Sequence, residues 1–231
     1  MLKPKLIELR RKVFEAVGSD RFSRPSLFDM DRKLEKYLPY RNGFFIEVGA
    51  NDGFRQSNTY HFERFKGWKG ILIEGIPELY QKCAVIRPNS RVFNCALVAE
   101  NYTEPFVTMK YANLMSIVEG ALKSEGNDNN HLKTAIEAQH DVDASYAIQV
   151  PARTLTSILD ECQVTEIDLF SLDVEGFELN VLKGLNFNKY RPKYMLIEAR
   201  FKTEIDNYIS SFYTEIDRLS IHDFLYQRKD V

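Results

Sequence analysis

From Gly43 onward, short apolar runs alternate with stretches in which apolar residues recur at helical spacing. The runs are rich in β-branched and aromatic residues and stop at glycine or polar residues, which is typical of buried strands. Strands are predicted at 44–48, 70–74 and 91–95, with helices at 57–65 and 77–86 between them. Strands joined by crossover helices predict a mostly parallel sheet in an α/β fold.

The middle of the chain follows a different pattern. Residues 106–111 and 146–150 alternate apolar and polar side chains, which predicts two strands with one wetter face. Between them, segment 112–145 includes the polar run 124–130, which predicts a loop that either covers a site as a lid or is disordered. Regular elements then resume, with helices at 155–162 and 178–183 and strands at 167–174, 193–199 and 223–226.

Two short helices are predicted before the sheet, at 3–17 and 31–38. They form an N-terminal helical extension, residues 1–42, that caps a main domain of residues 43–231. No window reaches the ~20 apolar residues of a membrane span, and charges are spread along the first turns of the chain. Neither a membrane span nor a secretory signal is therefore expected.

Composition narrows the function classes. The chain has 231 residues, of which 44% are hydrophobic and 28% charged, as in ordinary globular domains. Lys and Arg number 31 against 33 Asp and Glu, and a net charge of −2 argues against a nucleic acid or an anionic membrane as partner. The cysteines are odd in number and lack metal-type spacing, which favours reduced thiols and a cytoplasmic location: Cys83, Cys95 and Cys162.

In an open α/β sheet, ligands bind beyond the carboxyl ends of the strands. The first strand leads into Glu47–Gly53, and the second ends at Glu74, 21 residues after Gly53. That spacing is close to the ~20 residues at which an acidic side chain accepts hydrogen bonds from ribose hydroxyls. A lone strand-end carboxylate such as Glu47 is as often a helix cap or part of an ion pair. The glycine loop and Glu74 together predict a nucleoside-bearing cofactor.

The chemistry of the loop decides which cofactor is expected. It lacks the third glycine of Gly-x-Gly-x-x-Gly, and Asp52 would repel a pyrophosphate. A mouth lined by carboxylates suits a cationic sulfonium better, and the residues concerned are Glu47, Asp52, Glu74 and Asp173. S-adenosylmethionine is therefore predicted, with a nicotinamide-dependent oxidoreductase as an alternative that tight dinucleotide binding would reveal.

A second pair of carboxylates follows the strand at 167–174. Alternation along a strand would place Asp173 and Glu175 on one side, and Gly176 then ends the strand. Both carboxylates are predicted to face the reaction centre, while a cap on the helix that begins near residue 178 is the structural alternative. His131 and His140 flank the polar run and lie within reach of a substrate in the lid interpretation.

Four motifs occur in order along the chain: Phe45–Gly53, Ile71–Glu74, Asn94–Leu97 and Asp168–Glu178, with Val181–Gly184 continuing the last one. Together they resemble the FkbM family of S-adenosylmethionine-dependent methyltransferases. The resemblance runs from about residue 43 to residue 229, excluding the loop around 120–140. It implies a class I methyltransferase fold, a Rossmann-like, mostly parallel sheet of seven strands with flanking helices.

The same resemblance implies roles for individual residues. The first loop would hold the methionine part, Glu74 the ribose, and residues after the second and third strands the adenine, although Gly75-Ile76-Pro77 departs from the Pro-Asn-Pro often found in the family. The implied cofactor contacts are Glu47, Gly49, Ala50, Asn51, Asp52, Gly53, Asn58, Glu74, Gly75, Ile76, Asn94, Ala96, Leu97 and Asp173. Related sugar and macrolide O-methyltransferases place metal-binding acids at comparable strand ends, here Asp173 and Glu198.

These observations predict transfer of a methyl group to a hydroxyl oxygen of a sugar, a glycan or a hydroxylated natural product. Asp173 and Glu175 are the predicted catalytic residues. A divalent cation at Asp173 and Glu198 would lower the pKa of the hydroxyl group. A non-catalytic module that binds S-adenosylmethionine carries the same motif and would differ by its lack of turnover. The identity of the acceptor, the choice of oxygen over nitrogen and the oligomeric state stay open at this point.

Overall fold

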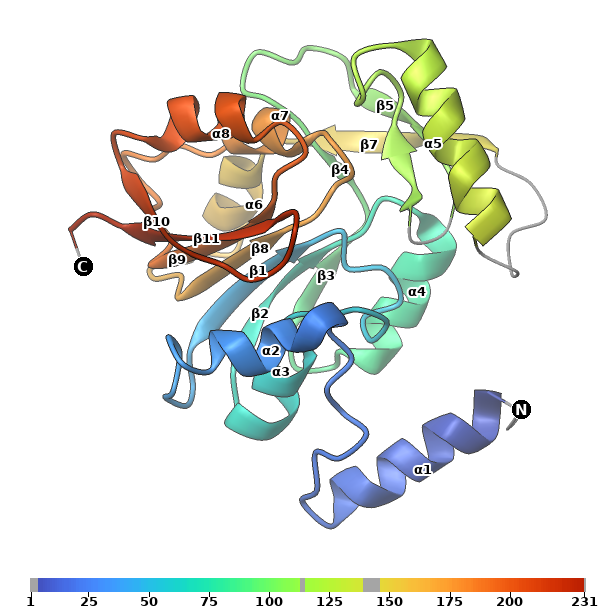
Figure 1. The fold of residues 1–231 in the computed structure, drawn as a ribbon, viewed down its shortest axis with the longest axis vertical. Coiled ribbons are helices and arrows are strands. Elements are labelled where there is room, and N and C mark those ends of the chain that lie inside the picture. Colours follow the sequence, from blue (N-terminus) through green and yellow to red (C-terminus); the bar gives the residue numbers. More distant parts are fainter. Residues whose placement is uncertain (1–3, 113–114, 139–145, 231) are drawn as a thin grey trace.

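The computed structural model describes residues 4–112, 115–138 and 146–230 (Figure 1). Its centre is a seven-stranded sheet in the order β10-β11-β9-β8-β1-β2-β3. β11 pairs antiparallel with β9 and β10, and the other pairs are parallel, so the predicted mostly parallel α/β sheet is confirmed. The strands are β1 Phe44–Val48, β2 Lys69–Ile73, β3 Arg91–Phe93, β8 Leu169–Leu172, β9 Tyr194–Glu198, β10 Tyr213–Arg218 and β11 Asp223–Arg228.

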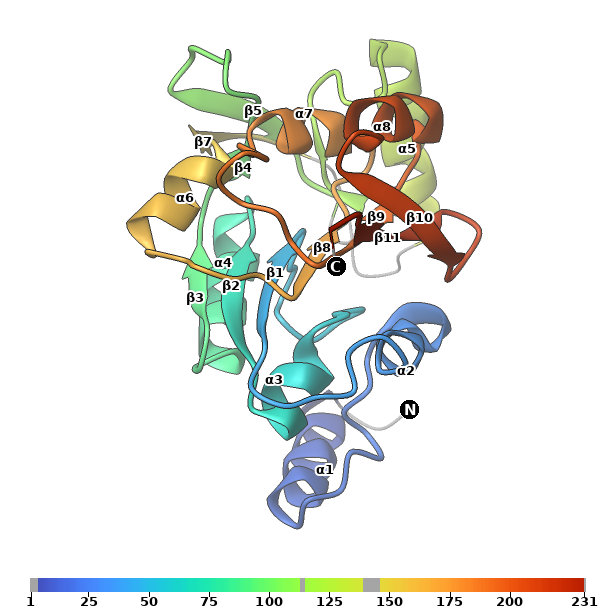
Figure 2. The same cartoon turned by 90° about the vertical axis from the view of Figure 1, so that its left-hand side faces the viewer.

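Helices cover both faces of this sheet, as Figures 1 and 2 show. Successive residues of β1 point to opposite faces, so Phe45 packs in the core under one helical layer and Ile46 in the core under the other. The first layer consists of α2 Met30–Leu34, α3 Tyr60–Lys66 and α4 Pro77–Ile86, and the second of α6 Leu155–Glu161, α7 Glu178–Lys183 and α8 Lys202–Ile209. Of these elements, α8 and β10 were not predicted from the sequence.

A smaller sheet and one helix lie beside the carboxyl ends of β1 and β2 (Figure 1). The sheet has the order β4-β7-β5-β6 and packs with the helix around a core of its own. The elements are β4 Ala96–Leu97, β5 Phe106–Lys110, β6 Ile117–Val118, α5 Glu125–Ala138 and β7 Ala147–Arg153. β5 and β7 confirm the two strands predicted from alternation in the middle of the chain.

The prediction of a loop at 124–130 is wrong, because α5 begins at Glu125. The Ser124 hydroxyl accepts the N–H of Asn127 at 3.1 Å, as expected for a residue that caps a helix. Leu132 and Ala135 are buried in the core of the small sheet. Burial of this narrow apolar stripe stabilises a helix whose polar composition is typical of a loop. Residues 139–145 of the predicted lid, His140 included, lie outside the described residues.

The N-terminal extension contains α1 Pro4–Ala16 and the short 3-10 helix η1 Leu27–Asp29 before α2. The apolar stripe that identified the first helix does not face the protein, since Leu9, Val13 and Val17 are each more than half exposed. The helix attaches by polar groups instead. The Arg11 guanidinium lies 3.8 Å from the centre of the Phe54 ring, and the Glu15 carboxylate accepts a hydrogen bond from Tyr60 at 2.8 Å.

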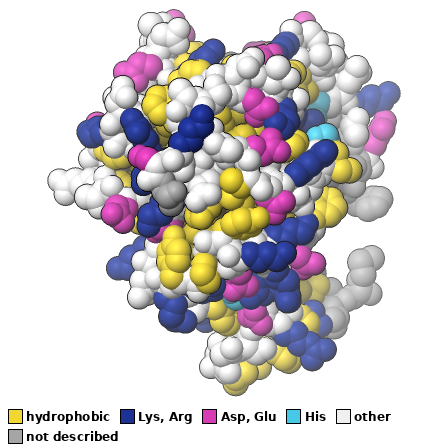
Figure 3. Space-filling model, turned by 60° about the vertical axis from the view of Figure 1, so that its left-hand side comes forward, with side chains coloured by type: hydrophobic (Ala, Val, Ile, Leu, Met, Phe, Trp, Pro, Cys, Tyr) yellow, Lys and Arg dark blue, Asp and Glu magenta, His cyan; other side chains and the backbone are white. Residues whose placement is uncertain are grey.

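The face of the molecule drawn in Figure 3 mixes Lys and Arg with Asp and Glu side chains. This distribution agrees with the small net charge of the chain. Within the described ranges, we find no helix with both the length and the apolar character that a bilayer crossing requires.

Candidate active site

A cavity opens where the carboxyl ends of β1, β2 and β8 meet the small sheet. It holds about 920 Å³ of empty space, including its open mouth. The walls come from the strand ends, from the loop between β1 and α3, and from side chains of β5 and β6. The position agrees with the rule that ligands bind beyond the carboxyl ends of parallel strands.

The turn after β1 brings the strand ends together. Gly49 has a φ of 83°, and a Cβ atom there would lie 2.0 Å from the carbonyl oxygen of Asp173. Only glycine therefore allows the ends of β1 and β8 to approach so closely. The N–H groups of Gly49 and Ala50 both donate to the carbonyl of Ile73 at 3.1 Å, which ties the turn to the end of β2.

Most of the cofactor contacts implied by resemblance lie on the cavity wall. They are Glu47, Gly49, Asn51, Asn58, Glu74, Gly75, Ala96, Leu97 and Asp173. These residues come from four separate stretches of the chain, so the fold brings together what the sequence separates. The structure does not place Ala50, Asp52, Gly53, Ile76 or Asn94 on the wall.

Those five residues shape the loops behind the wall. The Asp52 carboxylate accepts the N–H groups of Phe54 and Arg55 at 2.9 and 2.8 Å and so holds the turn after β1. The Asn94 amide donates to the carbonyls of Glu74 and Gly75 at 2.9 and 2.8 Å. Ala50, Gly53 and Ile76 are buried or packed against neighbouring elements. Asp52 is thus not part of the acidic mouth that its position in the sequence suggests.

Glu47 reaches the wall with its carboxylate already satisfied. It accepts hydrogen bonds from the hydroxyls of Ser57 and Thr59 at 2.9 and 2.6 Å and from the Asn58 N–H at 2.8 Å. The guanidinium of Arg87, itself fully buried, lies 3.3 Å away. The same guanidinium pairs with the Glu63 carboxylate at 2.8 Å. Of the two interpretations of Glu47, the structure therefore favours the helix cap and ion pair.

Glu74 ends β2 and connects two loops of the site. Its carboxylate accepts the N–H of Asn51 at 2.7 Å and the N–H of Ile76 at 2.8 Å. The carboxylate is buried, and that burial raises the pKa of Glu74 to about 7 despite these two hydrogen bonds. Each oxygen keeps a lone pair that can accept a ribose hydroxyl.

Asp173 and Glu175 line the cavity as well, and they form a cluster of carboxylates with Glu198. Asp173, Glu175 and Glu198 each offer an oxygen within 4.8 Å of the others. Confinement by the surrounding protein and the charges of Glu198 and Glu175 raise the pKa of Asp173 well above its usual range, although this side chain is exposed to the cavity. Burial and the charge of Glu198 raise the pKa of Glu175 to about 7. Like charges at this distance favour a proton on one of them.

The backbone brings Asp173 and Glu175 together by a turn, and the predicted alternation along a strand is wrong. β8 ends at Leu172, one residue before the first carboxylate. Glu175 has a φ of 57° and Gly176 a φ of 107°, both in the left-handed region. Such a conformation in a non-glycine residue is strained and clusters at functional sites. Glu178 stabilises this turn by accepting the N–H of Gly176 at 2.8 Å.

Two cationic or titratable groups contact the cluster. Arg200, two residues beyond the end of β9, pairs with the carboxylate of Glu175 and lies 3.8 Å from that of Glu198. His131 of α5 places its Nε2 atom 3.8 Å from Glu175 and 3.0 Å from the carbonyl oxygen of Met115. Burial and the charge of Arg200 lower the pKa of His131. The structure thus brings His131 of α5 to the carboxylate cluster.

Sequence reasoning missed several residues on or beside the wall. Arg200 follows a strand end, so the same rule that identified Glu74 and Glu198 would have found it. Arg55 and Gln56 belong to the glycine loop and were passed over because they are neither glycine nor acidic. Met109 and Val118 come from the small sheet, and no local pattern predicts that this sheet covers the cavity.

The wall fits a ligand that carries an amino-acid cation and a nucleoside. The Asn58 Oδ1 atom is buried and has no hydrogen-bond partner in the described part of the chain, while its Nδ2 donates to the Ser171 hydroxyl at 3.1 Å. A buried acceptor without a donor is costly unless a ligand supplies one. The ammonium group of S-adenosylmethionine is such a donor, and Glu74 offers acceptors for ribose hydroxyls.

The carboxylate cluster also supplies the oxygen ligands that hard divalent cations take. Glu198 Oε2 is buried and lacks a hydrogen-bond partner among the described residues. Arg200 already contributes one positive charge beside Glu175 and Glu198. The oxygens of Asp173 and Glu198 match this donor set, and a cation there would share the cluster with the Arg200 guanidinium, whose positive charge repels it.

Comparison with known proteins identifies one family. Residues 47–227 match the family described as "Methyltransferase FkbM domain". No curated protein matches the chain. The matched range includes the glycine loop, Glu74, the turn at Asp173–Glu175 and the whole of the small sheet, so every wall of the cavity lies inside it.

Solved structures show distant likeness. A TehB-like S-adenosylmethionine-dependent methyltransferase from Corynebacterium glutamicum is 11% identical, with 98% of this chain and 100% of that chain covered and a TM-score of 0.42. A fibrillarin pre-rRNA processing protein from Methanococcus jannaschii is 12% identical, with 82% and 68% covered and a TM-score of 0.42. A fibrillarin/Nop5p complex gives 9% identity, 88% and 80% coverage and a TM-score of 0.45. Likeness at this level says nothing about substrate.

Proposed function

Because the chain belongs to the FkbM methyltransferase family, we propose that it transfers a methyl group from S-adenosylmethionine to a hydroxyl oxygen of a sugar, a glycan or another hydroxylated small molecule. The observation that carries the choice of oxygen is Glu175, a cavity-wall carboxylate with a pKa of about 7. A general base works best when its pKa lies near the operating pH. Glu175 is thus suited to take the proton of a hydroxyl group.

One set of cavity residues binds the cofactor, and another acts on the methyl acceptor. Glu74 accepts the ribose hydroxyls, and Asn58 accepts the ammonium group of the methionine part. Bound S-adenosylmethionine supplies the electrophilic methyl group. Glu175 removes the acceptor proton while the new carbon–oxygen bond forms, and Asp173 orients the acceptor. Arg200 holds the Glu175 carboxylate toward the cavity.

Two measurements test this proposal. Calorimetry with S-adenosylmethionine and S-adenosylhomocysteine tests the cofactor, and we expect micromolar dissociation constants or tighter. A mass-spectrometric screen of sugars, glycans and hydroxylated metabolites tests the acceptor, and we expect a net mass gain of one CH2 unit that fragmentation assigns to a hydroxyl oxygen. Absence of heat and of a thermal shift with both cofactor forms would overturn the proposal.

Two alternatives give different results in the same experiments. A module that binds S-adenosylmethionine without catalysis would give heat in calorimetry and no methylated product with any acceptor. A nicotinamide-dependent oxidoreductase would bind a dinucleotide more tightly than S-adenosylmethionine. The family match and the missing third glycine both favour methyl transfer over hydride transfer.

A divalent cation is a second proposal at the same site, favoured by the buried Glu198 Oε2 atom, which accepts no hydrogen bond from the described residues and has Arg200 3.8 Å away. Asp173 and Glu198 would hold it, and a hard ion such as Mg²⁺ would lower the pKa of the acceptor hydroxyl. Chelation is then expected to suppress turnover without abolishing cofactor binding, and Asp173→Asn to mimic chelation. Full activity after exhaustive chelation would remove the cation from the mechanism.

The proposal also includes the cellular location of the reaction and the class of partner. We expect the cytoplasm, because Cys83, Cys95 and Cys162 are free thiols, and burial raises the pKa of both Cys83 and Cys95 to about 12. Thiols of this kind stay protonated and unreactive. We expect a small molecule or glycan as the partner, and no nucleic acid, because charges of both signs are interspersed on the face shown in Figure 3.

A further inference from the structure

Arg55 stands apart from the other charged residues of the cavity wall. It lies in the loop between β1 and α3, where the Asp52 carboxylate accepts its backbone N–H at 2.8 Å. Gln56 follows with a φ of 58°, so the loop turns sharply at this point. The Arg55 side chain is exposed, and its guanidinium makes no hydrogen bond or ion pair with any residue in the ranges that the structure describes.

The charge of the cavity wall indicates which part of the cofactor Arg55 binds. The remaining charged residues that line the cavity are acidic: Glu47, Glu74, Asp173 and Glu175. S-adenosylmethionine carries two cationic groups, the sulfonium and the ammonium, and one anionic carboxylate. An acidic wall attracts both cations and repels the carboxylate. The carboxylate therefore needs a local positive charge, and Arg55 is the one basic residue of the wall among the described residues.

We propose that Arg55 binds the carboxylate of the methionine part and makes the site selective for cofactors that retain this group. The inference rests on the proposed function. A guanidinium donates two parallel N–H groups to a carboxylate, a geometry that a point charge cannot reproduce. Asn58, three residues further along the chain, offers the buried Oδ1 acceptor for the neighbouring ammonium group. One loop thus recognises both ends of the amino-acid group.

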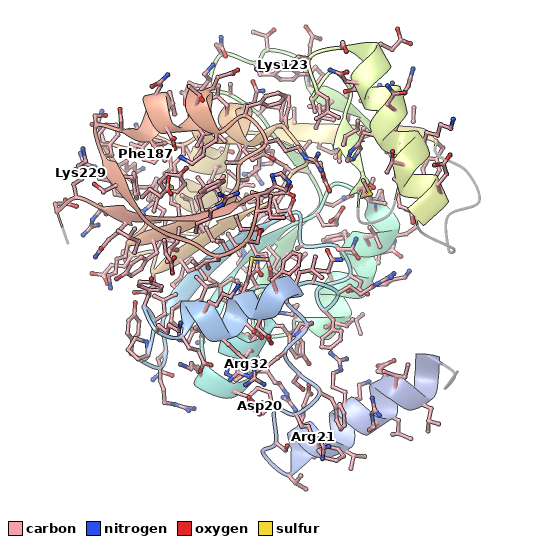
Figure 4. All side chains as sticks on the ribbon, viewed as in Figure 1. Asp20, Arg21, Arg32, Lys123, Phe187 and Lys229 are labelled. Atoms are coloured by element: carbon pink, nitrogen blue, oxygen red, sulfur yellow. The ribbon has the colours of Figure 1, made fainter. Side chains whose placement is uncertain are left out.

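The test compares two ligands that differ only by this carboxylate, S-adenosylmethionine and its decarboxylated form. Calorimetry gives both dissociation constants for the unaltered protein and for Arg55→Ala, Arg55→Lys and Arg32→Ala. Arg32→Ala is the matched control, since Arg32 is an exposed arginine of α2 remote from the cavity wall (Figure 4). The double comparison isolates the arginine–carboxylate contact from general loss of charge.

We expect the unaltered protein to prefer the carboxylate form by roughly 10- to 100-fold, the range of charge-assisted hydrogen bonds. Arg55→Ala should lose this preference or reverse it, because the acidic wall repels the carboxylate, and its affinity for the decarboxylated form should not fall. Arg55→Lys should keep part of the preference, and Arg32→Ala all of it. These results would establish the contact without any knowledge of the methyl acceptor.

Other outcomes contradict the inference in distinguishable ways. An unaltered protein that binds both forms equally, or an Arg55→Ala variant that keeps the preference, overturns the role of Arg55 and leaves the proposed function standing. Equal weakening of both forms in Arg55→Ala places the arginine at the nucleoside and also overturns it. If the unaltered protein binds neither form, the proposed function fails together with the inference.

Discussion

Two groups of strand-end carboxylates border the same cavity and differ in almost every physical property. Glu47, at the end of β1, accepts hydrogen bonds from three neighbours and lies against the buried guanidinium of Arg87. After β8, Glu175 shares Arg200 with Glu198, and both Asp173 and Glu175 have raised pKa values. Both groups lie at or just beyond the carboxyl end of an apolar strand. Their environments, and not their positions along the chain, separate a structural role from a chemical one.

The difference shows what prepares a carboxylate for proton transfer. Hydroxyl, N–H and guanidinium donors surround the Glu47 carboxylate, so its oxygens are already occupied. Acidic neighbours and burial make the charge at Asp173 and Glu175 costly, and a proton relieves that cost. Both groups lie inside the range that matches the FkbM methyltransferase domain.

Neutralising Glu175 should have the largest effect. Glu175→Gln is expected to lower the rate of methyl transfer by roughly 10²- to 10⁴-fold, because a glutamine cannot accept the hydroxyl proton. Single-turnover rates with an acceptor found in the screen give the change, and S-adenosylhomocysteine affinity should move little. Glu161→Gln, an exposed glutamate on α6, is the control. A Glu175→Gln variant with an undiminished rate of methyl transfer would exclude Glu175 as the general base.

The pH profile sharpens the same prediction. Glu175 acts as a base only when ionised, and its pKa is about 7. The rate of methyl transfer should therefore rise as pH increases through 7 and level off above it. Rate measurements across this range, with cofactor and acceptor saturating, check the sign; a rate that falls with rising pH would assign the proton transfer to another group.

Glu47→Gln should act on stability instead of rate. The substitution leaves the fully buried Arg87 with Glu63 as its remaining carboxylate, and we expect the free energy of unfolding to fall by about 3 kcal/mol. Chemical denaturation measures this loss. Glu8→Gln, in the exposed pair with Lys12 on α1, should change it by less than about 1 kcal/mol. Equal losses of unfolding free energy in the two variants would show that the buried Glu47–Arg87 pair matters no more to stability than an exposed pair.

Glu74 lies between the two extremes, since it is hydrogen-bonded like Glu47 and has a raised pKa like Glu175. Glu74→Gln is expected to weaken S-adenosylhomocysteine binding by roughly 10- to 100-fold. Burial raises the pKa of Glu74 to about 7, so affinity in the unaltered protein should decline as pH falls below 7, where the carboxylate becomes protonated. Calorimetry at several pH values tests both statements. A variant with the same affinity and the same pH dependence as the unaltered protein would reduce Glu74 to a loop connector.

The smallest effect is expected at Asp128, a fully buried acid of α5. Its two oxygens accept the N–H groups of Gly120 and Leu122. Asp128→Asn keeps one acceptor and should lower the free energy of unfolding by about 1 kcal/mol. Hydrogen exchange over α5 should accelerate while S-adenosylhomocysteine affinity stays constant. A large loss of S-adenosylhomocysteine affinity would show that α5 contacts the cofactor directly.

Local pattern sufficed for the elements that bury an apolar face on the main sheet. Four strands, β1, β2, β8 and β9, can be recognised as apolar runs because each must be apolar to be buried. The same holds for the helix that begins at Pro77. Local pattern failed at α5, where a few buried residues stabilise a polar helix, and at α1, which attaches by Arg11 and Glu15 and leaves its apolar stripe in solvent.

The sequence by itself determined the fold class and the family resemblance, and most of the cofactor contacts that this resemblance implies lie on the cavity wall. Strand ends can be read from one chain, since apolar runs and glycines mark where each strand stops. Only the tertiary structure decided what each acid does. Whether Glu47 meets donors and Glu175 meets acids depends on Arg87, Arg200 and His131, which come from distant elements. Electrostatic energy depends on distance through space, and no pattern along the chain contains that distance.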